Sequence, residues 1–79
     1  MLMHEWRCPI CGRVLRASSR RSLEQMVYEH RRREVERSGL FRKEREGRLT
    51  VYVEVATGAR YYGPSVAFER LLELRRREQ

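Results

Sequence analysis

Two cysteines, Cys8 and Cys11, stand two residues apart in the stretch WRCPICGRV, and the chain has no other cysteine. In a tight turn, this spacing can place both thiolates on one metal ion. Tetrahedral zinc takes four ligands, with sulfur at ~2.3 Å and imidazole nitrogen at ~2.0 Å. Pro9 stiffens the turn, and Gly12 lets the backbone curl toward the sulfurs. The pair therefore supplies half of a zinc site, and the rest must come from elsewhere.

His30 is the candidate third ligand, because it lies about two turns into a predicted helix. At 100° per residue, one face of that helix carries Leu23, Met26, Val27, His30 and Glu34. An apolar residue three positions before the histidine would dock the helix by packing while His30 docks it by coordination. The sequence thus predicts Zn²⁺ bound by Cys8, Cys11 and His30.

The fourth ligand has two candidates within the chain. Glu34 lies one helical turn after His30 on the same face, and carboxylates bind zinc. His4 is the only other histidine, but along an extended strand it would be ~13 Å from Cys8, at ~3.3 Å per residue. It can ligate only if the N-terminus folds back. Glu34 has the better position and His4 the better chemistry, and water or a partner's side chain is a third option.

A redox role for the cysteine pair is the alternative to metal binding. A thioredoxin-type pair stands at the N-terminus of a helix that follows a strand. Here the pair is followed by GRVLRA, which looks like the second arm of a hairpin. Metal binding is therefore the favoured interpretation.

These residues need a hairpin and a helix to bring them together. Residues 3–17 read as a short β-hairpin whose turn carries the cysteines. Ser22 is the predicted N-cap of the helix, with Gln25 completing a capping box, and Ser19 is an alternative start. Ser38-Gly39 supplies the C-terminal stop.

The second half predicts a further hairpin and helix. Residues 40–48 read as a linker or an irregular strand that turns at Gly47. Residues 49–55 alternate apolar and polar side chains, as a strand does, and a turn at Gly58 leads to a return strand at 60–62. Ser65 is expected to cap a last helix that runs to about Arg77.

The predicted fold class is therefore α+β. A zinc-stapled ββα unit at 1–39 packs with a second β-hairpin and helix at 40–79. A chain of 79 residues buries a modest core, and neither half could bury much alone. We expect one compact domain.

The chain is strongly basic, with a net charge of +7 that comes almost entirely from arginine. Such an excess favours attraction to a polyanion, above all nucleic acid. Eleven glutamates are interspersed, so solvated, salt-bridged faces are the alternative. No apolar run approaches membrane-spanning length and no signal peptide is recognisable, so we expect no membrane partner and a reducing, cytoplasmic setting.

The stretches CPICG and LEQMVYEH give residues 6–34 a resemblance to zinc fingers of the two-cysteine, two-histidine type. The resemblance is closest to the small single-finger proteins common in archaea and their mobile elements. It implies DNA binding and transcription regulation, with DNA favoured over RNA. Two departures stand out. Eighteen residues separate Cys11 from His30, against ~12 in the usual finger, and RRREVE stands where a second histidine is expected.

In such fingers the helix enters the major groove and its first turns read bases. On this chain Arg21 could read guanine and Gln25 adenine, and Tyr28 could stack on a base. For Trp6 we favour a partly buried position that covers the core over stacking on a base. The predicted nucleic-acid-binding residues are Arg13, Arg16, Arg20, Arg21, Gln25, Tyr28, Arg31 and Arg32, with Arg33 as a further phosphate contact.

The segment 51–70 has a weaker resemblance to the opening of a GIY-YIG nuclease domain. The matching positions are Tyr52, Tyr61, Gly63 and Arg70. Leu71 stands where that family has its catalytic arginine, and the chain ends before the family's metal-binding glutamate. We therefore expect no enzyme activity.

The alternative function is a protein–protein interaction module or a homodimer. It would use strand 49–55 as an exposed edge, or the leucine stripe of the last helix.

Overall fold

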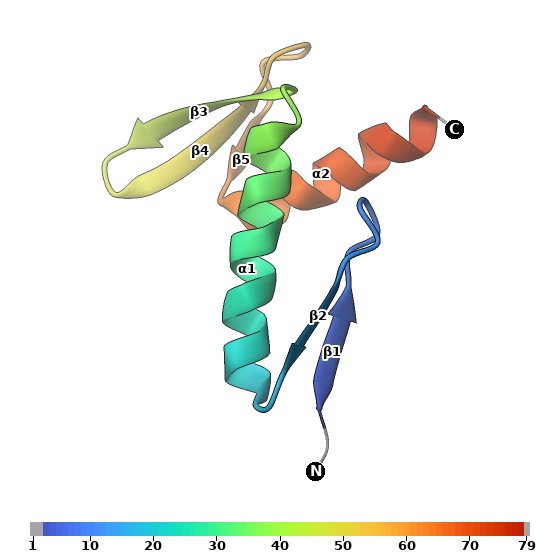
Figure 1. The fold of residues 1–79 in the computed structure, drawn as a ribbon. Helices are drawn as coiled ribbons and strands as arrows, with labels where there is room; N and C mark the ends of the chain where they lie inside the picture. The colour runs from blue at the N-terminus through green and yellow to red at the C-terminus, as the bar shows by residue number, and fades with distance from the viewer. Residues whose placement is uncertain (1–2, 79) are drawn as a thin grey trace.

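The computed structural model describes residues 3–78, which form two helices and two antiparallel sheets (Figure 1). This confirms the α+β class. In chain order the elements are β1 (His4–Arg7), β2 (Val14–Ala17), α1 (Arg20–Arg37), β3 (Phe41–Glu46), β4 (Leu49–Glu54), β5 (Arg60–Tyr62) and α2 (Pro64–Arg77). Within residues 3–78, no helix combines the length and the apolar character that crossing a membrane requires.

The predicted N-terminal hairpin is confirmed, with the cysteines in its turn. Strands β1 and β2 pair antiparallel, and Trp6 lies opposite Leu15. The Cys8 amide donates to the Arg13 carbonyl at 2.9 Å, and the Gly12 amide donates to the Cys8 carbonyl at 2.8 Å. Gly12 adopts φ 77°, a conformation that glycine reaches without the strain of a β-carbon. The turn is thus closed by the backbone bonds that flank the cysteines.

Helix α1 begins earlier than the favoured capping box predicted. Ser19 is the N-cap, and its hydroxyl accepts a hydrogen bond from the Ser22 amide at 3.1 Å. The prediction of Ser22 as the cap is wrong, and the alternative start is correct. Arg20 and Arg21 are good helix formers, so the helix extends back to the first serine that can cap it. It ends as predicted at Ser38, whose amide donates to the carbonyls of the preceding turn.

The second sheet has three strands, in the order β3-β4-β5, where we predicted a two-stranded hairpin. The segment interpreted as a linker or irregular strand is a regular strand, β3. It pairs with β4 from Phe41 opposite Glu54 to Glu46 opposite Leu49, and turns at Gly47. Strand β4 is therefore central, so the prediction that residues 49–55 form an exposed edge is wrong. Backbone hydrogen bonds join β4 to β3 along one edge and to β5 along the other.

Helix α2 also starts before its predicted cap. Gly63 occupies the N-cap position, and among the residues that the structure describes no side chain caps the helix. Pro64 takes the first helical position, where its missing amide costs nothing and its fixed φ suits the helix. Ser65 therefore lies inside the first turn, and the prediction that it caps the helix is wrong.

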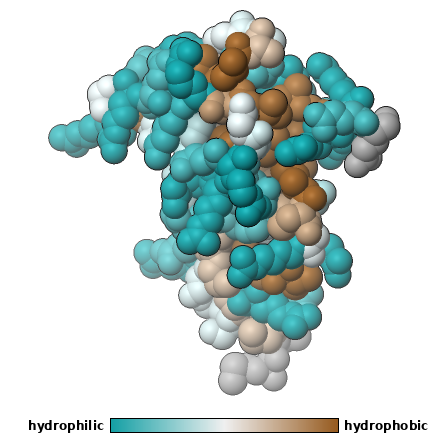
Figure 2. All heavy atoms as spheres, turned by 45° about the horizontal axis from the view of Figure 1, so that its top comes forward, coloured by the Kyte–Doolittle hydropathy of each residue, from teal (hydrophilic) through white to brown (hydrophobic). Residues whose placement is uncertain are grey.

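The hydrophobic core draws on both halves of the chain. Its fully buried members are Cys8, Val35, Tyr52, Ala67, Phe68 and Leu71. Helix α1 packs across α2, with the hairpin on one side of α1 and the sheet at its C-terminal end (Figure 1). Hydrophilic side chains cover much of the face in Figure 2, and hydrophobic ones show between them in an interrupted band. The hairpin turn that carries the cysteines is therefore built into the same core as α2.

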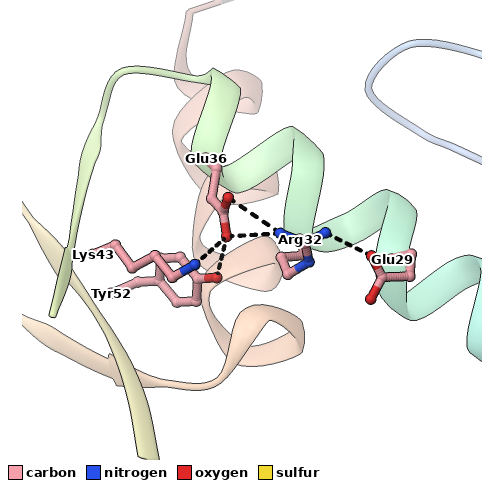
Figure 3. A network of polar contacts seen from close by, with 5 residues as sticks. All are labelled: Glu29, Arg32, Glu36, Lys43 and Tyr52. Carbon is pink, nitrogen blue, oxygen red and sulfur yellow. Dashed lines mark hydrogen bonds and ion pairs between the residues drawn. The ribbon is translucent and has the colours of Figure 1, made fainter. Parts of the chain in front are cut away.

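A polar network fastens α1 to the second sheet (Figure 3). The Tyr52 hydroxyl donates to the Glu36 carboxylate at 2.7 Å, and the Lys43 ammonium lies 3.4 Å from it. Arg32 pairs with Glu36 at 3.3 Å and with Glu29 at 2.6 Å. Burial, followed by the bond to Glu36, raises the pKa of Tyr52, and the same bond holds the pKa of Glu36 below its ordinary value. This network fixes the end of α1 on β3 and β4.

A second ion pair joins the sheet to α2. Glu54 is 2% exposed, and the Arg70 guanidinium donates to its carboxylate at 2.7 Å. That bond holds the pKa of Glu54 below its ordinary value of 4.5. A carboxylate with a lowered pKa stabilises the fold above its unfolded pKa and loses that contribution as the pH falls through its folded pKa.

We therefore expect Glu54→Gln to lower the melting temperature by several degrees at neutral pH, because the amide removes the charge that pairs with Arg70. The difference from the parent protein should shrink as the pH falls below 4.5, where the unfolded parent protonates Glu54, and should be lost once the pH has fallen through the lowered folded pKa. Thermal melts followed by circular dichroism across that range measure both effects. Glu69→Gln, at an exposed glutamate of α2, is the matched control. A constant difference at every pH would contradict the assignment.

Candidate metal centre

Four potential ligand atoms converge between the hairpin turn and α1. One ligand atom each from Cys8, Cys11, His30 and Glu34 lies within 4.8 Å of all the others, close enough to hold one metal ion. The Cys11 sulfur is 3.3 Å from His30 Nε2, and His30 Nε2 is 3.5 Å from Glu34 Oε1. Tetrahedral zinc with ordinary bond lengths separates its ligand atoms by roughly 3.3–3.8 Å. The two separations measured at His30 Nε2 therefore lie within the range that a tetrahedral ion sets.

The two cysteines contribute from different environments. Cys8 is 1% exposed and belongs to the core, whereas Cys11 is exposed. Burial raises the pKa of the Cys8 thiol, and the backbone amides of Cys11 and Ile10 partly offset the rise. The Ile10 amide donates to the Cys8 sulfur at 3.4 Å. These amides stand where they would stabilise a thiolate, which is the form that a metal binds.

The helix ligands are also held by neighbours. His30 is buried, and the Trp6 ring meets it edge to face at 5.7 Å between centroids. Glu34 is buried as well, and the Arg37 guanidinium donates to its Oε1 atom. Partners outside the ligand shell fix the orientation of metal ligands in this way. The prediction that Trp6 serves as partly buried cover is confirmed, since it packs against the core and the ligand histidine.

The structure brings Glu34 to the cluster and leaves His4 away from it. His4 is exposed at the start of β1, opposite Ala17, at the end of the hairpin far from the cysteine turn (Figure 1). Regular pairing with β2 keeps β1 extended, so His4 does not fold back toward the cysteines. Between the two fourth ligands considered from the sequence, the geometry selects Glu34.

We expect Glu34→Ala to weaken metal binding by more than the roughly 10–100-fold that second-shell substitutions cost. His4→Ala should leave it unchanged. Competition of each variant with a chromophoric chelator gives the affinity, and native mass spectrometry gives the stoichiometry. Loss of the metal from His4→Ala, with Glu34→Ala unaffected, would reverse the assignment.

The predicted nucleic-acid-binding residues divide into three groups. Arg13, Arg21, Gln25 and Tyr28 are exposed, and neither arginine forms an ion pair within residues 3–78. Arg16 and Arg20 are exposed but paired, with Glu5 at 2.7 Å and Glu24 at 3.3 Å. Arg31 and Arg32 are half-buried and make contacts within the fold.

Arg31 turns inward between the hairpin and α2. Its guanidinium carbon lies 5.4 Å from the centre of the Trp6 ring and 5.5 Å from that of Phe68, and its Nε atom is buried without a hydrogen-bond partner in the described residues. Arg32 is held in the network of Figure 3. Sequence periodicity could not separate these two from outward-facing arginines, because the aromatic rings and Tyr52 come from other elements.

Two basic residues beside the metal cluster stand out in the structure. Arg33 and Arg37 follow His30 at one-turn spacing, and both border the same pocket as Cys11 and His30. Arg33 is one of the predicted phosphate contacts, whereas Arg37 is not among the predicted residues. The i, i+4 spacing from Arg33 is the signal that could have found it.

The positions that resemble a GIY-YIG domain take part in packing and ion pairs. Tyr52 binds Glu36, and Tyr61 and Arg70 both donate to Glu54. No protein-family model, curated protein or solved structure matches this chain.

Proposed function

We propose that this chain is a small zinc-binding module that binds nucleic acid, with zinc stapling the hairpin to α1. The observation that carries the proposal is the convergence of Cys8, Cys11, His30 and Glu34 from two elements. Two thiolates, one imidazole and one carboxylate suit zinc better than the harder cations, which prefer oxygen ligands. The module would work in a reducing compartment such as the cytoplasm, where both thiols persist.

The distribution of charge supports a polyanionic partner. Every glutamate except Glu69 forms an ion pair within residues 3–78. The interspersed glutamates therefore neutralise particular arginines instead of spreading over the surface. The exposed arginines left without an ion pair in that part of the chain are Arg7, Arg13, Arg21, Arg33, Arg45, Arg48, Arg76 and Arg77. Together they give the surface an excess of positive charge, which attracts nucleic-acid phosphates over long range whichever of these arginines makes the contact.

The exposed start of α1 supports DNA over RNA as the target. Arg21, Gln25 and Tyr28 share one side of the helix, and Tyr28 is 47% exposed. Arginine and glutamine can each form paired hydrogen bonds with base edges in the major groove of DNA, which is wide enough to admit a helix. Sequence-specific binding of this kind would fit a role in transcription regulation.

Two measurements on the protein purified without chelator test the proposal. Native mass spectrometry with metal analysis should find one zinc ion per chain. Fluorescence anisotropy with labelled duplex DNA and RNA should show binding that weakens steeply between roughly 50 and 200 mM salt. Protein without zinc, or without binding to either duplex at the lower salt concentration, would refute the corresponding half of the proposal.

A homodimer is the second candidate, and one surface favours it. An apolar pocket of about 410 Å³ is lined by Leu40, Val55, Ala56 and Leu74, at the junction of the sheet with α2. Light scattering after size exclusion separates the two functions. A dimer that does not bind nucleic acid would favour the alternative.

A further inference from the structure

Three arginines surround the open side of the metal cluster. Arg13, Arg33 and Arg37, with Cys11 and His30, line a pocket of about 300 Å³, which we call the arginine pocket. Arg13 comes from the hairpin turn, whereas Arg33 and Arg37 lie one turn apart on α1. The pocket therefore exists only where the hairpin and the helix meet, at the cluster itself.

The arginines of the pocket are open to an external ligand. All three are exposed, and Arg13 and Arg33 form no ion pair in the described part of the chain. Arg37 contacts Glu34, yet its side chain remains 68% exposed. A second pocket of about 430 Å³ shares Arg13, His30 and Arg33 and continues along α1 to Gln25. The two pockets adjoin through these shared residues, and we refer to them together as the groove between hairpin and helix.

The net charge of one divalent ion with its four ligands is too small to need three arginines as counter-charges. Two thiolates and one carboxylate outweigh a divalent ion by one negative charge, because neutral imidazole adds none. Three guanidinium groups exceed that single charge and leave positive charge facing solvent. Guanidinium groups bind phosphate through paired hydrogen bonds.

We propose that the arginine pocket binds a backbone phosphate of a nucleic acid and that the metal centre sets its geometry. The proposal rests on the proposed function, since it assumes that the chain binds nucleic acid. It adds the place of contact. A phosphate in the pocket lies against Arg13 on one side and against Arg33 and Arg37 on the other, and the nucleic acid extends along the groove toward Gln25.

Because the arginine pocket adjoins the metal site, zinc binding and nucleic-acid binding should be coupled. A zinc ion held by Cys11 of the hairpin and His30 of α1 would join the two elements and so keep Arg13 near Arg33 and Arg37. Nucleic acid joins the same two elements from outside. Coupling between binding sites is reciprocal, so a nucleic acid seated in the pocket should tighten zinc binding by the factor by which zinc tightens nucleic-acid binding.

The test compares two double variants that remove equal charge. Arg13→Gln with Arg33→Gln empties the arginine pocket of two cations. Arg45→Gln with Arg48→Gln removes two exposed arginines at the β3–β4 turn that form no ion pair with any residue from 3 to 78. The probe is a short labelled DNA duplex, titrated from roughly 50 to 200 mM salt. Cobalt(II) substituted at the metal site gives an absorption spectrum that reports whether each variant keeps tetrahedral coordination.

The slope of log affinity against log salt should fall by about two in the pocket variant, since each phosphate-binding cation contributes about one. It should change far less in the control variant. Duplex DNA should also slow zinc transfer from the parent protein to a chelator, and this effect should be lost in the pocket variant. Equal changes in the two variants, with cobalt spectra intact, would overturn the pocket assignment. Failure of the parent protein to bind DNA or RNA would instead refute the proposed function.

Discussion

Removal of zinc by a strong chelator is expected to take away most of the stability of this chain. A protein of 79 residues has a total stability on the order of 4–12 kcal/mol. A metal present at about 1,000 times its dissociation constant contributes about 4 kcal/mol, and more as the affinity rises. Within residues 3–78, β1 and β2 pair with each other and with no other strand, so side-chain packing against α1 and α2 is what holds the hairpin besides the metal. The hairpin should therefore separate from α1 first.

Thermal melts of the zinc-loaded protein, with and without chelator, measure the loss. Cys11→Ser should reproduce the effect of the chelator, because it removes a ligand from an exposed position without changing the core. His4→Ala is the matched control at the other end of the hairpin. Coincident melting curves for loaded and chelated protein would show that the cluster does not hold a stabilising metal.

Phe68→Ala is expected to have the second large effect, and to act on both halves. Phe68 is 1% exposed in the core, and truncation of such a phenylalanine costs about 3–5 kcal/mol. Its ring lies 6.3 Å from that of Trp6, which in turn contacts His30. Loss of the Phe68 ring should therefore loosen the support of the ligand histidine and weaken zinc binding as well.

Urea denaturation of the zinc-loaded protein gives the change in stability, and chelator competition gives the change in zinc affinity. Val66→Ala is the control, because Val66 lies on the same helix and is 51% exposed. That substitution should fall within about 0.5 kcal/mol. Unchanged zinc affinity in Phe68→Ala, despite a lower stability, would show that α2 does not support the metal centre.

The local features of this fold could be predicted because each one is encoded within a few residues. The cysteine spacing and Gly12 define the turn, and helical periodicity places His30 and Glu34 on one face. The segment FRKERE could not be identified as a regular strand, because β3 has a single apolar side chain, Phe41. Its place in the sheet comes from backbone pairing with β4, which no local pattern records.

The N-cap of α1 and the inward orientation of Arg31 could not be predicted, for different reasons. Ser19 and Ser22 both carry the chemistry of a cap, and only the helix-forming preference of Arg20 and Arg21 separates them. Arg31 and Arg33 are indistinguishable in sequence, yet one stacks on Trp6 and Phe68 and the other faces solvent. That difference arises from the packing of α2 against α1, which periodicity cannot encode.

The unequal exposure of the two cysteines would make exchange of a bound metal proceed from one side of the site. Cys8 is enclosed by the core, so an incoming chelator or thiol reagent reaches the centre past Cys11 and the three arginines. Anionic chelators should therefore strip the ion faster than cationic or neutral ones of equal affinity, because the local field raises their concentration at the entrance. Alkylating reagents should modify Cys11 well before Cys8. The rate at which a bound metal leaves would then depend on how long the exposed Cys11 sulfur stays coordinated to it.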